Sequence, residues 1–427
     1  MRRAAILALA LAASACSLGR SFTSAKYVDD LRPARRVSTF AAGDDGDLRA
    51  KPPPPLPRKP RPHVEPVEKR LSNGVRVVMV ERHDFPIVSF VMVLDRGADD
   101  APAGVASVYA DALAGTSDKY DANEAFAYLR YFGVELRTWT TRSAVLLQAT
   151  SLTPLWGSAL SRTAPMFAKP ALTSKDLDRA RALVAAEAAH ELTDGHAIAS
   201  QRALAELFGA SDPRGAPEAG RSPEAVQAIG QGAVESFRDM YLSADRVTVV
   251  AVGDFKSDKM IGALERALGG LAKKRAASGE AHETAPDAHG GRIVVVDRPG
   301  AVQSNVAIAW GAPAPGDPDA TALEVLAKMT GGGLSSRLNL TVRKELGASY
   351  GVHMTVSPRR AGGSVLLTAA IDTPRTSDAL GGILAELERL GREPPSRAEL
   401  AAAKNQAIDE LYDGNSAAIA RFLARAA

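Results

Sequence analysis

Hydrophobic positions along this chain follow two periods, one typical of strands and one typical of helices. Short alternating or continuous apolar runs predict strands, and apolar residues at three- and four-residue spacing predict amphipathic helices. The predicted elements are strands around the Asn73–Gly74 turn and at 87–94, helices at 104–113 and 123–132, strands at 134–138 and 144–150, helices at about 155–167, 174–192, 197–208 and 231–241, and a strand at 246–252.

The same order begins again near residue 292. It comprises strands at 292–297 and 304–310, helices at 320–329 and 335–346, a strand pair at 352–356 and 364–371, and helices at about 376–391 and 396–412. A long internal repeat indicates two copies of a unit, here of roughly 200 residues. We therefore predict an α+β fold with two homologous domains at 67–270 and 291–427, each a largely antiparallel β-sheet packed against helices and joined by a polar linker at 271–290.

The second copy has no counterpart of the strand at 246–252, because the sequence reaches Ala427 within its helical part. Either the second domain is C-terminally truncated or its sheet has an uncovered edge, which favours unwanted pairing. Of the two interpretations we favour truncation.

The first residues predict an export signal at 1–16. A basic start, an apolar stretch from Ala4 to Ala13 and two small residues precede Cys16, the only cysteine of the chain, and the stretch is too short to span a membrane permanently. The segment from Ala13 to Cys16 is similar to a bacterial lipobox with lipidation at Cys16, although Ala13 replaces the usual leucine. Ordinary cleavage after Ala15 is the alternative. We expect the protein on the periplasmic side of a bacterial envelope, held by this lipid.

Residues 17–66 contain few apolar clusters and end in a proline-rich stretch at 51–62. Such a composition predicts an extended polyproline tether that holds the folded body away from a membrane anchor. A disordered leader is the alternative, and either interpretation keeps this segment out of the core.

Charge and cysteine content narrow the classes of function. The chain has 52 basic and 49 acidic side chains, a formal charge of +3, so there is no case for a nucleic-acid partner. A single cysteine excludes an internal disulfide, and stability outside the cytoplasm must therefore come from burial.

Four motifs carry a family resemblance when their order and spacing are taken together. They are the runs Leu71 to Val77, Arg96 to Ala106, Gly331 to Leu338 and Arg343 to Tyr350. In this order they resemble the pitrilysin- or insulinase-type metallopeptidases, which are inverted zincins, over about residues 67–427. The family uses His-x-x-Glu-His on one helix, in which two imidazoles bind zinc and the carboxylate activates water.

This chain lacks that motif. The resemblance implies that Ser107 stands at the first histidine, Ala110 at the catalytic glutamate and Asp111 at the second histidine, while Glu187 retains the third ligand. A serine is a poor zinc ligand and an alanine cannot act as a general base, so we expect no zinc in this chain. Asp111 and Glu187 could still pair around Ca²⁺ or Mg²⁺, but two carboxylates are too few for a good site.

The resemblance also implies a role for Arg343 and Tyr350. In family enzymes an arginine and a tyrosine of the second domain bind the substrate backbone and help to polarise the scissile carbonyl. A guanidinium and a phenol are suitable donors for a developing oxyanion. The alternative is structural, with Arg343 near a helix C-terminus and Tyr350 filling a gap beside a strand.

Other possible sites are weaker. His190 and His196 are six residues apart with Gly195 between them, so they do not share a helix face as zincin histidines do. No Gly-x-Ser-x-Gly elbow occurs. The run Gly331 to Gly333 lacks a Walker lysine and is better explained as a turn between packed elements than as a phosphate cradle.

The sequence therefore predicts a catalytically degenerate metallopeptidase-family subunit that is inactive alone. In the first interpretation it pairs with a zinc-bearing homologous subunit, which supplies zinc and the general base, and the pair binds and processes peptides. The main alternative is a non-proteolytic structural or binding module of an envelope complex. A self-sufficient enzyme with an unfamiliar site is a third, weaker interpretation.

Overall fold

The computed structural model describes residues 65–209, 212–273, 291–360 and 362–411. These residues lie in one compact unit that contains two β-sheets. The predicted signal with Cys16, nearly all of the tether, most of the predicted linker and residues 412–427 lie outside the described residues. Among the helices that are described, none combines the length and the hydrophobicity of a membrane span.

The first sheet has six strands in the order β1-β2-β6-β3-β5-β4. All neighbouring strands are antiparallel except β2 and β6, which are parallel. The strands are β1 (Val67–Arg70), β2 (Arg76–Glu81), β3 (Ile87–Leu94), β4 (Glu135–Thr140), β5 (Val145–Leu152) and β6 (Val247–Gly253). The predicted Asn73–Gly74 turn joins β1 to β2, and Gly74 has the left-handed φ of 102° that such a turn requires.

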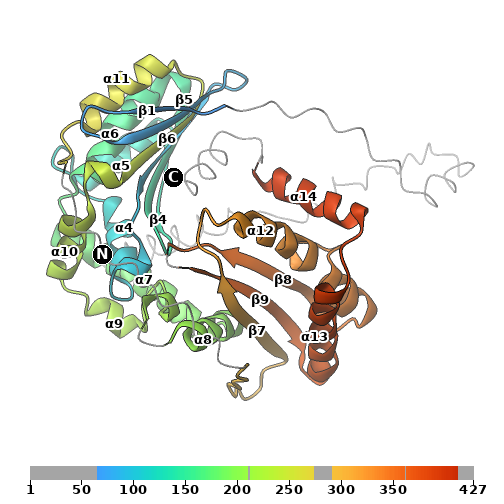
Figure 1. The fold of residues 1–427 in the computed structure, drawn as a ribbon. Coiled ribbons are helices and arrows are strands. Elements are labelled where there is room, and N and C mark those ends of the chain that lie inside the picture. Colours follow the sequence, from blue (N-terminus) through green and yellow to red (C-terminus); the bar gives the residue numbers. More distant parts are fainter. Residues whose placement is uncertain (1–64, 210–211, 274–290, 361, 412–427) are drawn as a thin grey trace, which may run out of the picture. The chain divides into compact units, whose positions relative to one another are not determined.

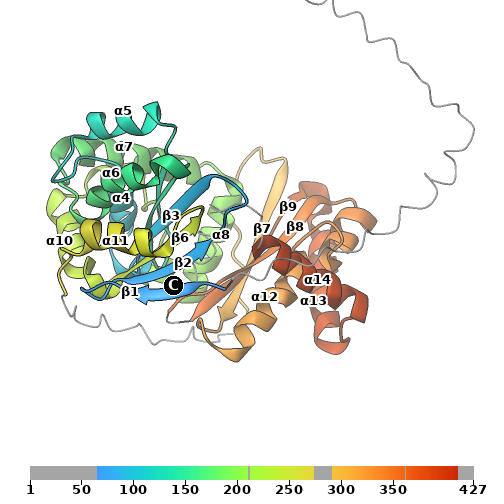
Figure 2. The ribbon, with the colours of Figure 1, turned by 90° about the horizontal axis from the view of Figure 1, so that it is seen from above.

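Side chains of this sheet alternate between two apolar clusters, as strand periodicity requires. Along β3, Phe90 and Met92 enter the main core, while Val91 and Val93 enter a smaller cluster on the opposite face. The helices cover the face that carries the main core, as Figures 1 and 2 show. The helical segments are η1 (Ala98–Asp100), α4 (Val105–Leu113), α5 (Ala122–Tyr131), η2 (Thr153–Leu155), α6 (Trp156–Ala168), α7 (Ser174–Glu191), α8 (Gly195–Phe208), η3 (Pro213–Gly215), α9 (Pro223–Gln227), α10 (Gln231–Tyr241), η4 (Ala244–Arg246) and α11 (Ser257–Leu268).

The second sheet is antiparallel, with three strands in the order β7-β9-β8. Its elements are β7 (Gln303–Ala312), α12 (Pro318–Gly331), the π-helix η5 (Asn339–Glu345), β8 (Ser349–Ser357), β9 (Gly363–Asp372), η6 (Thr373–Arg375), α13 (Thr376–Arg392) and α14 (Arg397–Leu411). Its own core joins alternate residues of the sheet, such as Val352 and Leu367, to Leu338 and Ile383 of the helical segments. Helix α8 also packs against β7. The predicted α+β class with largely antiparallel sheets is confirmed.

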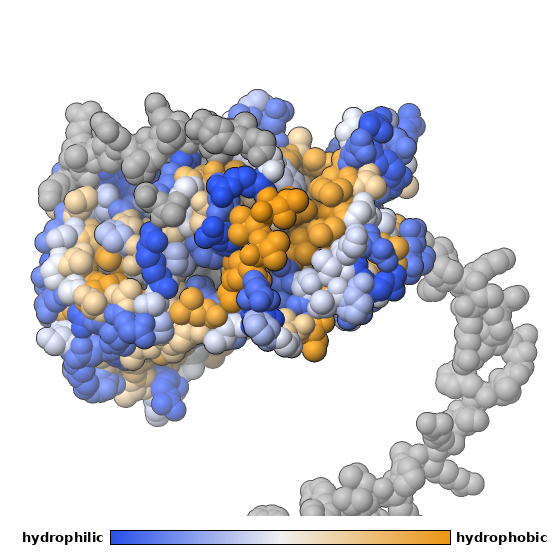
Figure 3. Space-filling view, turned by 90° about the horizontal axis from the view of Figure 1, so that it is seen from below, coloured by the Kyte–Doolittle hydropathy of each residue, from blue (hydrophilic) through white to orange (hydrophobic). Residues whose placement is uncertain are grey.

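The strand predicted at 292–297 is wrong. Residues 291–298 form no helix or strand, and Ile293 and Val295 are 93% and 86% exposed. In the first sheet β2 is held between β1 and β6, but among the described residues nothing pairs with 292–297. An apolar run with strand periodicity forms a strand only where a neighbour satisfies its backbone groups. Hydrophobic residues also gather elsewhere on the surface, as the view from below in Figure 3 shows.

Within the described residues β7 pairs only with β9, so no strand occupies the place beside β7 that β6 takes beside β3. The predicted helix at 335–346 is also shorter than expected, because η5 covers only Asn339–Glu345. The buried side-chain amide of Asn339 donates to the carbonyls of Gly333 and Val352, and these bonds tie the preceding turn to β8.

Candidate functional site

Helix α4, which carries the degenerate zinc motif, lies in the main core. All of its residues except Asp111 are buried. The helix begins after Gly104, whose φ of 86° would strain any residue with a side chain. Helices α7 and α10 and strand β4 pack around it. The motif positions are therefore enclosed by protein on most sides.

The position of the first histidine ligand is closed by a hydrogen bond. The Ser107 hydroxyl donates to the Glu218 carbonyl at 2.9 Å, and Ser107 is 7% exposed. Ala110, at the position of the catalytic glutamate, is 1% exposed. The segment that contains Glu218 thus lies directly against this part of α4 and helps to shield it from solvent.

Asp111 and Glu187 lie near each other, yet neither is placed to hold a metal ion. Burial raises the pKa of Asp111 to about 6, and the nearby Glu187 carboxylate raises it further, while Arg179 lowers it. Arg179 donates to the carbonyls of Asp111 and Ala114 at 3.0 and 2.6 Å, which satisfies the C-terminal end of α4. Glu187 is exposed on α7.

The donor set does not fit zinc. A structural zinc site needs four donors and a catalytic site three plus water, whereas Ser107 is committed to a carbonyl and Ala110 has no donor atom. Among the residues that the structure describes, no group of three His, Cys, Asp or Glu side chains is arranged to share a metal ion.

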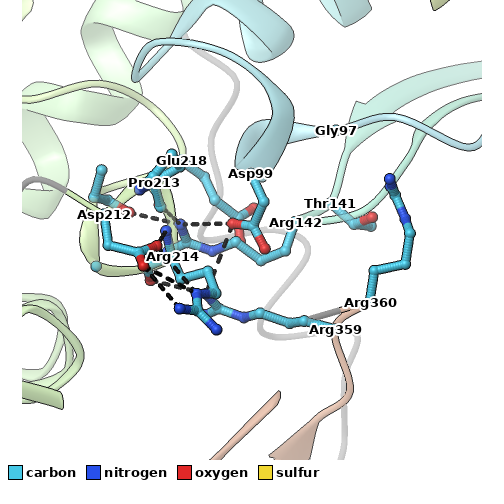
Figure 4. Close-up of polar contacts among 12 residues, drawn as sticks. Gly97, Asp99, Thr141, Arg142, Asp212, Pro213, Arg214, Glu218, Arg359 and Arg360 are labelled. Atoms are coloured by element: carbon cyan, nitrogen blue, oxygen red, sulfur yellow. Dashed lines mark hydrogen bonds and ion pairs between the residues drawn. The ribbon is translucent and has the colours of Figure 1, made fainter. Parts of the chain in front are cut away.

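A charged cluster beside α4 was not predicted from the sequence (Figure 4). Arg142, in the β4–β5 turn, contacts Glu218 at 2.7 Å and donates to the Ala216 carbonyl at 2.6 Å. Its guanidinium also lies 3.8 Å from Asp99. Arg359, from the β8–β9 turn of the second sheet, lies 3.7 Å from the same carboxylate.

Burial governs the protonation of this cluster. It raises the pKa of Asp99 to about 6, although Arg359 and Arg142 pull the value down. It also lowers the pKa of Arg359 to about 10, against the attraction of Asp99. The sequence offers one signal for the cluster, the tandem Arg359–Arg360 in a turn.

Arg343 and Tyr350 are brought together, as their spacing allows. The Arg343 guanidinium lies 5.4 Å from the centre of the Tyr350 ring, within the range of a cation–π contact. Arg343 is in the last turn of η5, and Tyr350 is near the start of β8. Tyr350 is 86% exposed, so its ring fills no gap beside the strand.

His190 and His196 belong to different helices. His190 is at the end of α7 and His196 at the start of α8, and Asp194 caps α8 by accepting from the His196 and Ala197 amides. Both imidazoles are exposed. They form no zincin pair, as the spacing indicates.

The glycine run at 331–333 serves close packing. Gly331 ends α12 against the backbone of Met354, where an added Cβ would lie 2.7 Å from the amide nitrogen. The interpretation of this run as a turn between packed elements therefore agrees with its surroundings.

Comparison with known proteins agrees with this geometry. Residues 229–407 match the family described as Peptidase M16 inactive domain. An uncharacterized zinc protease of Mycobacterium bovis is 26% identical over 352 residues, which are 82% of this chain and 80% of that protein.

Two solved structures share the fold. One is the peptidase M16 inactive domain from Pseudomonas fluorescens, with 18% identity, a TM-score of 0.72 and coverage of 84% of this chain and 87% of that chain. The other is a protease from Helicobacter pylori, with 20% identity, a TM-score of 0.74 and coverage of 85% and 89%. The chain belongs to the pitrilysin- and insulinase-type M16 family, as a member that lacks the zinc motif.

Proposed function

We propose that this chain is the zinc-free subunit of a paired peptidase and that it contributes Arg343 and Tyr350 to an active site whose zinc and general base come from a homologous partner. Peptides are the substrate class. The lipid on Cys16 and the tether hold the pair on the periplasmic side of the envelope.

The observation that carries this proposal is a contrast between the two halves of the chain. The motif positions on α4 are closed, with Ala110 1% exposed, whereas Tyr350 is 86% exposed beside Arg343. A large aromatic ring left in water stabilises the fold little, because hydrophobic stabilisation scales with the apolar area removed from water. An exposed arginine–tyrosine contact is therefore better explained by binding than by folding.

The chemistry of the pair suits a peptide backbone. A guanidinium presents several N–H donors in a fixed plane, and a phenol adds an O–H donor. Donors aimed at a carbonyl oxygen stabilise the negative charge that develops there when the carbon is attacked. This chain alone has no residue at the motif that can activate the attacking water, which is why a partner is required.

The test is turnover of a complex reconstituted from this chain and a zinc-bearing homologue. Arg343→Ala and Tyr350→Phe should each lower kcat by roughly 10²-fold if each side chain acts as one oxyanion donor. Matched controls are Arg392→Ala, which removes an exposed arginine at the end of α13, and Tyr131→Phe, which alters a tyrosine that is 83% exposed on α5. Both controls should leave kcat unchanged.

The scaffold alternative makes the opposite prediction. If the chain is only a structural or binding module, Arg343→Ala and Tyr350→Phe should leave the partner's turnover within about a factor of two of the wild-type value, near the limit of what kinetic free energies resolve. That outcome, in a complex shown to be active and intact, removes the catalytic role of the pair.

A further inference from the structure

The turn between β8 and β9 places two consecutive arginines in contact with the first half of the molecule. Turns between strands normally face solvent, yet Arg359 is 2% exposed. Its guanidinium donates to the Arg214 carbonyl at 2.8 Å and lies over the Phe208 ring at 4.9 Å. The turn is thus inserted among residues that precede the second sheet in the chain.

Arg360 makes a second, independent set of contacts. It donates to both carboxylate oxygens of Asp100, each at 3.2 Å, which is the bidentate geometry that fixes a guanidinium in a plane. It also donates to the carbonyls of Asp95 and Ser143 at 2.8 and 3.2 Å. Figure 4 shows Arg359 and Arg360 extending from the turn towards this acidic side of the first half.

The surface that receives the turn is built by the first half alone. The amides of Ala98 and Asp99 donate to the carbonyls of Thr141 and Arg142 at 3.0 and 2.8 Å. The Gly97 amide donates to the Asp100 carboxylate at 2.8 Å. A side chain at Gly97 would meet the Thr141 carbonyl at 2.3 Å, so the two segments are in close backbone contact. These bonds do not involve the arginine turn and remain when the turn leaves.

Such an interface is specific in geometry but opens at a modest free-energy cost. Removing charged groups from water costs free energy that offsets most of their mutual attraction, so a buried ion pair contributes little net stability. Interfaces inside a chain that are polar and small favour relative motion of the parts. The apolar cores of the two halves are separate, and each helps to hold its own sheet together.

We propose that the Arg359–Arg360 turn is a clasp, which holds the β7-β9-β8 sheet against the first half through Asp99 and Asp100, and that its release lets this sheet pivot while both halves stay folded. The halves also meet where α8 packs against β7, which places the pivot there. Because Tyr350 lies on β8, the state of the clasp also sets where the exposed Arg343–Tyr350 contact stands. The clasp does not depend on the catalytic role proposed above.

The experiment measures the separation of the halves in the full chain. Nitroxide labels at Ser161→Cys on α6 and Leu384→Cys on α13 report a distance by double electron–electron resonance in a Cys16→Ser background. Both positions are exposed. The otherwise unmodified protein should give a narrow distribution. Arg359→Ala with Arg360→Ala should add a second population at a different distance, while the circular dichroism spectrum is retained.

Two further variants complete the test. Arg360→Ala alone removes the more exposed arginine and leaves Arg359 in place, so it should produce a smaller second population in a folded protein. Arg389→Ala is the control, because this arginine pairs with Glu386 and Glu393 at the end of its own helix. An unchanged distribution in the folded clasp variants overturns the proposal. Loss of folding in Arg360→Ala overturns it too, because the turn would then be part of a single obligatory core.

Discussion

Restoring the family's zinc motif should fail in this chain, because the motif positions are filled. The change is Ser107→His, Ala110→Glu and Asp111→His together. Ser107 and Ala110 are 7% and 1% exposed, so neither new side chain can point into solvent. Each added group overpacks the core at a cost of about 1–3 kcal/mol. A carboxylate at Ala110 adds the cost of a buried charge, about several kcal/mol if unpaired.

The sum is at least about 4 kcal/mol, a large part of the roughly 5–15 kcal/mol that stabilises an ordinary domain. Urea unfolding followed by circular dichroism measures this loss, and native mass spectrometry counts bound zinc. Asp111→His alone is the control, since Asp111 is only partly buried, and its change should stay within about 1 kcal/mol. A triple variant that unfolds at the wild-type urea concentration and binds stoichiometric zinc refutes the idea of a closed site.

Three further outcomes are expected. Burial holds the pKa of Asp99 at about 6, above its ordinary 3.8, so its stabilising contribution is complete below 3.8 and is lost as the pH rises through 6; Asp99→Asn should flatten the dependence of the unfolding free energy on pH in that window. Gly253→Ala should unfold the first sheet at lower urea, because the new Cβ would lie 2.1 Å from the Ile87 carbonyl at a φ of 138°, whereas Gly157→Ala on α6 meets nothing within 4 Å and should be tolerated. In a bacterial host, Cys16→Ser should release the protein from membranes, as fractionation can show, and a wild-type protein that is soluble and unacylated would contradict the anchor.

Local pattern was enough to predict most elements and the registers of the motifs. The alternation of β3 and the Asn73–Gly74 turn depend on neighbours in sequence, and their physics is local. The position of α4 also followed from its motif, which placed Ser107, Ala110 and Asp111 on one helix. Likewise, the spacing of His190 and His196 was sufficient to exclude a zincin pair.

What the sequence could not provide depends on pairing between distant segments. The bond from Ser107 to Glu218 spans 111 residues, and the contact of Arg360 with Asp100 spans 260. No periodicity carries such information. The run at 292–297 has the same pattern as a buried strand, but whether it forms one is decided by a neighbour that the described residues do not supply. The same limit hid the charged cluster around Asp99.

Native mass spectrometry of the complex isolated from the envelope tests the proposed pairing most directly. We predict an assembly of this chain with a homologous subunit, in which zinc stays with the partner when the two are separated and this chain leaves with none. Zinc that remains on this chain after separation, or a chain that cleaves peptides alone in a chelator-sensitive way, would contradict the proposal.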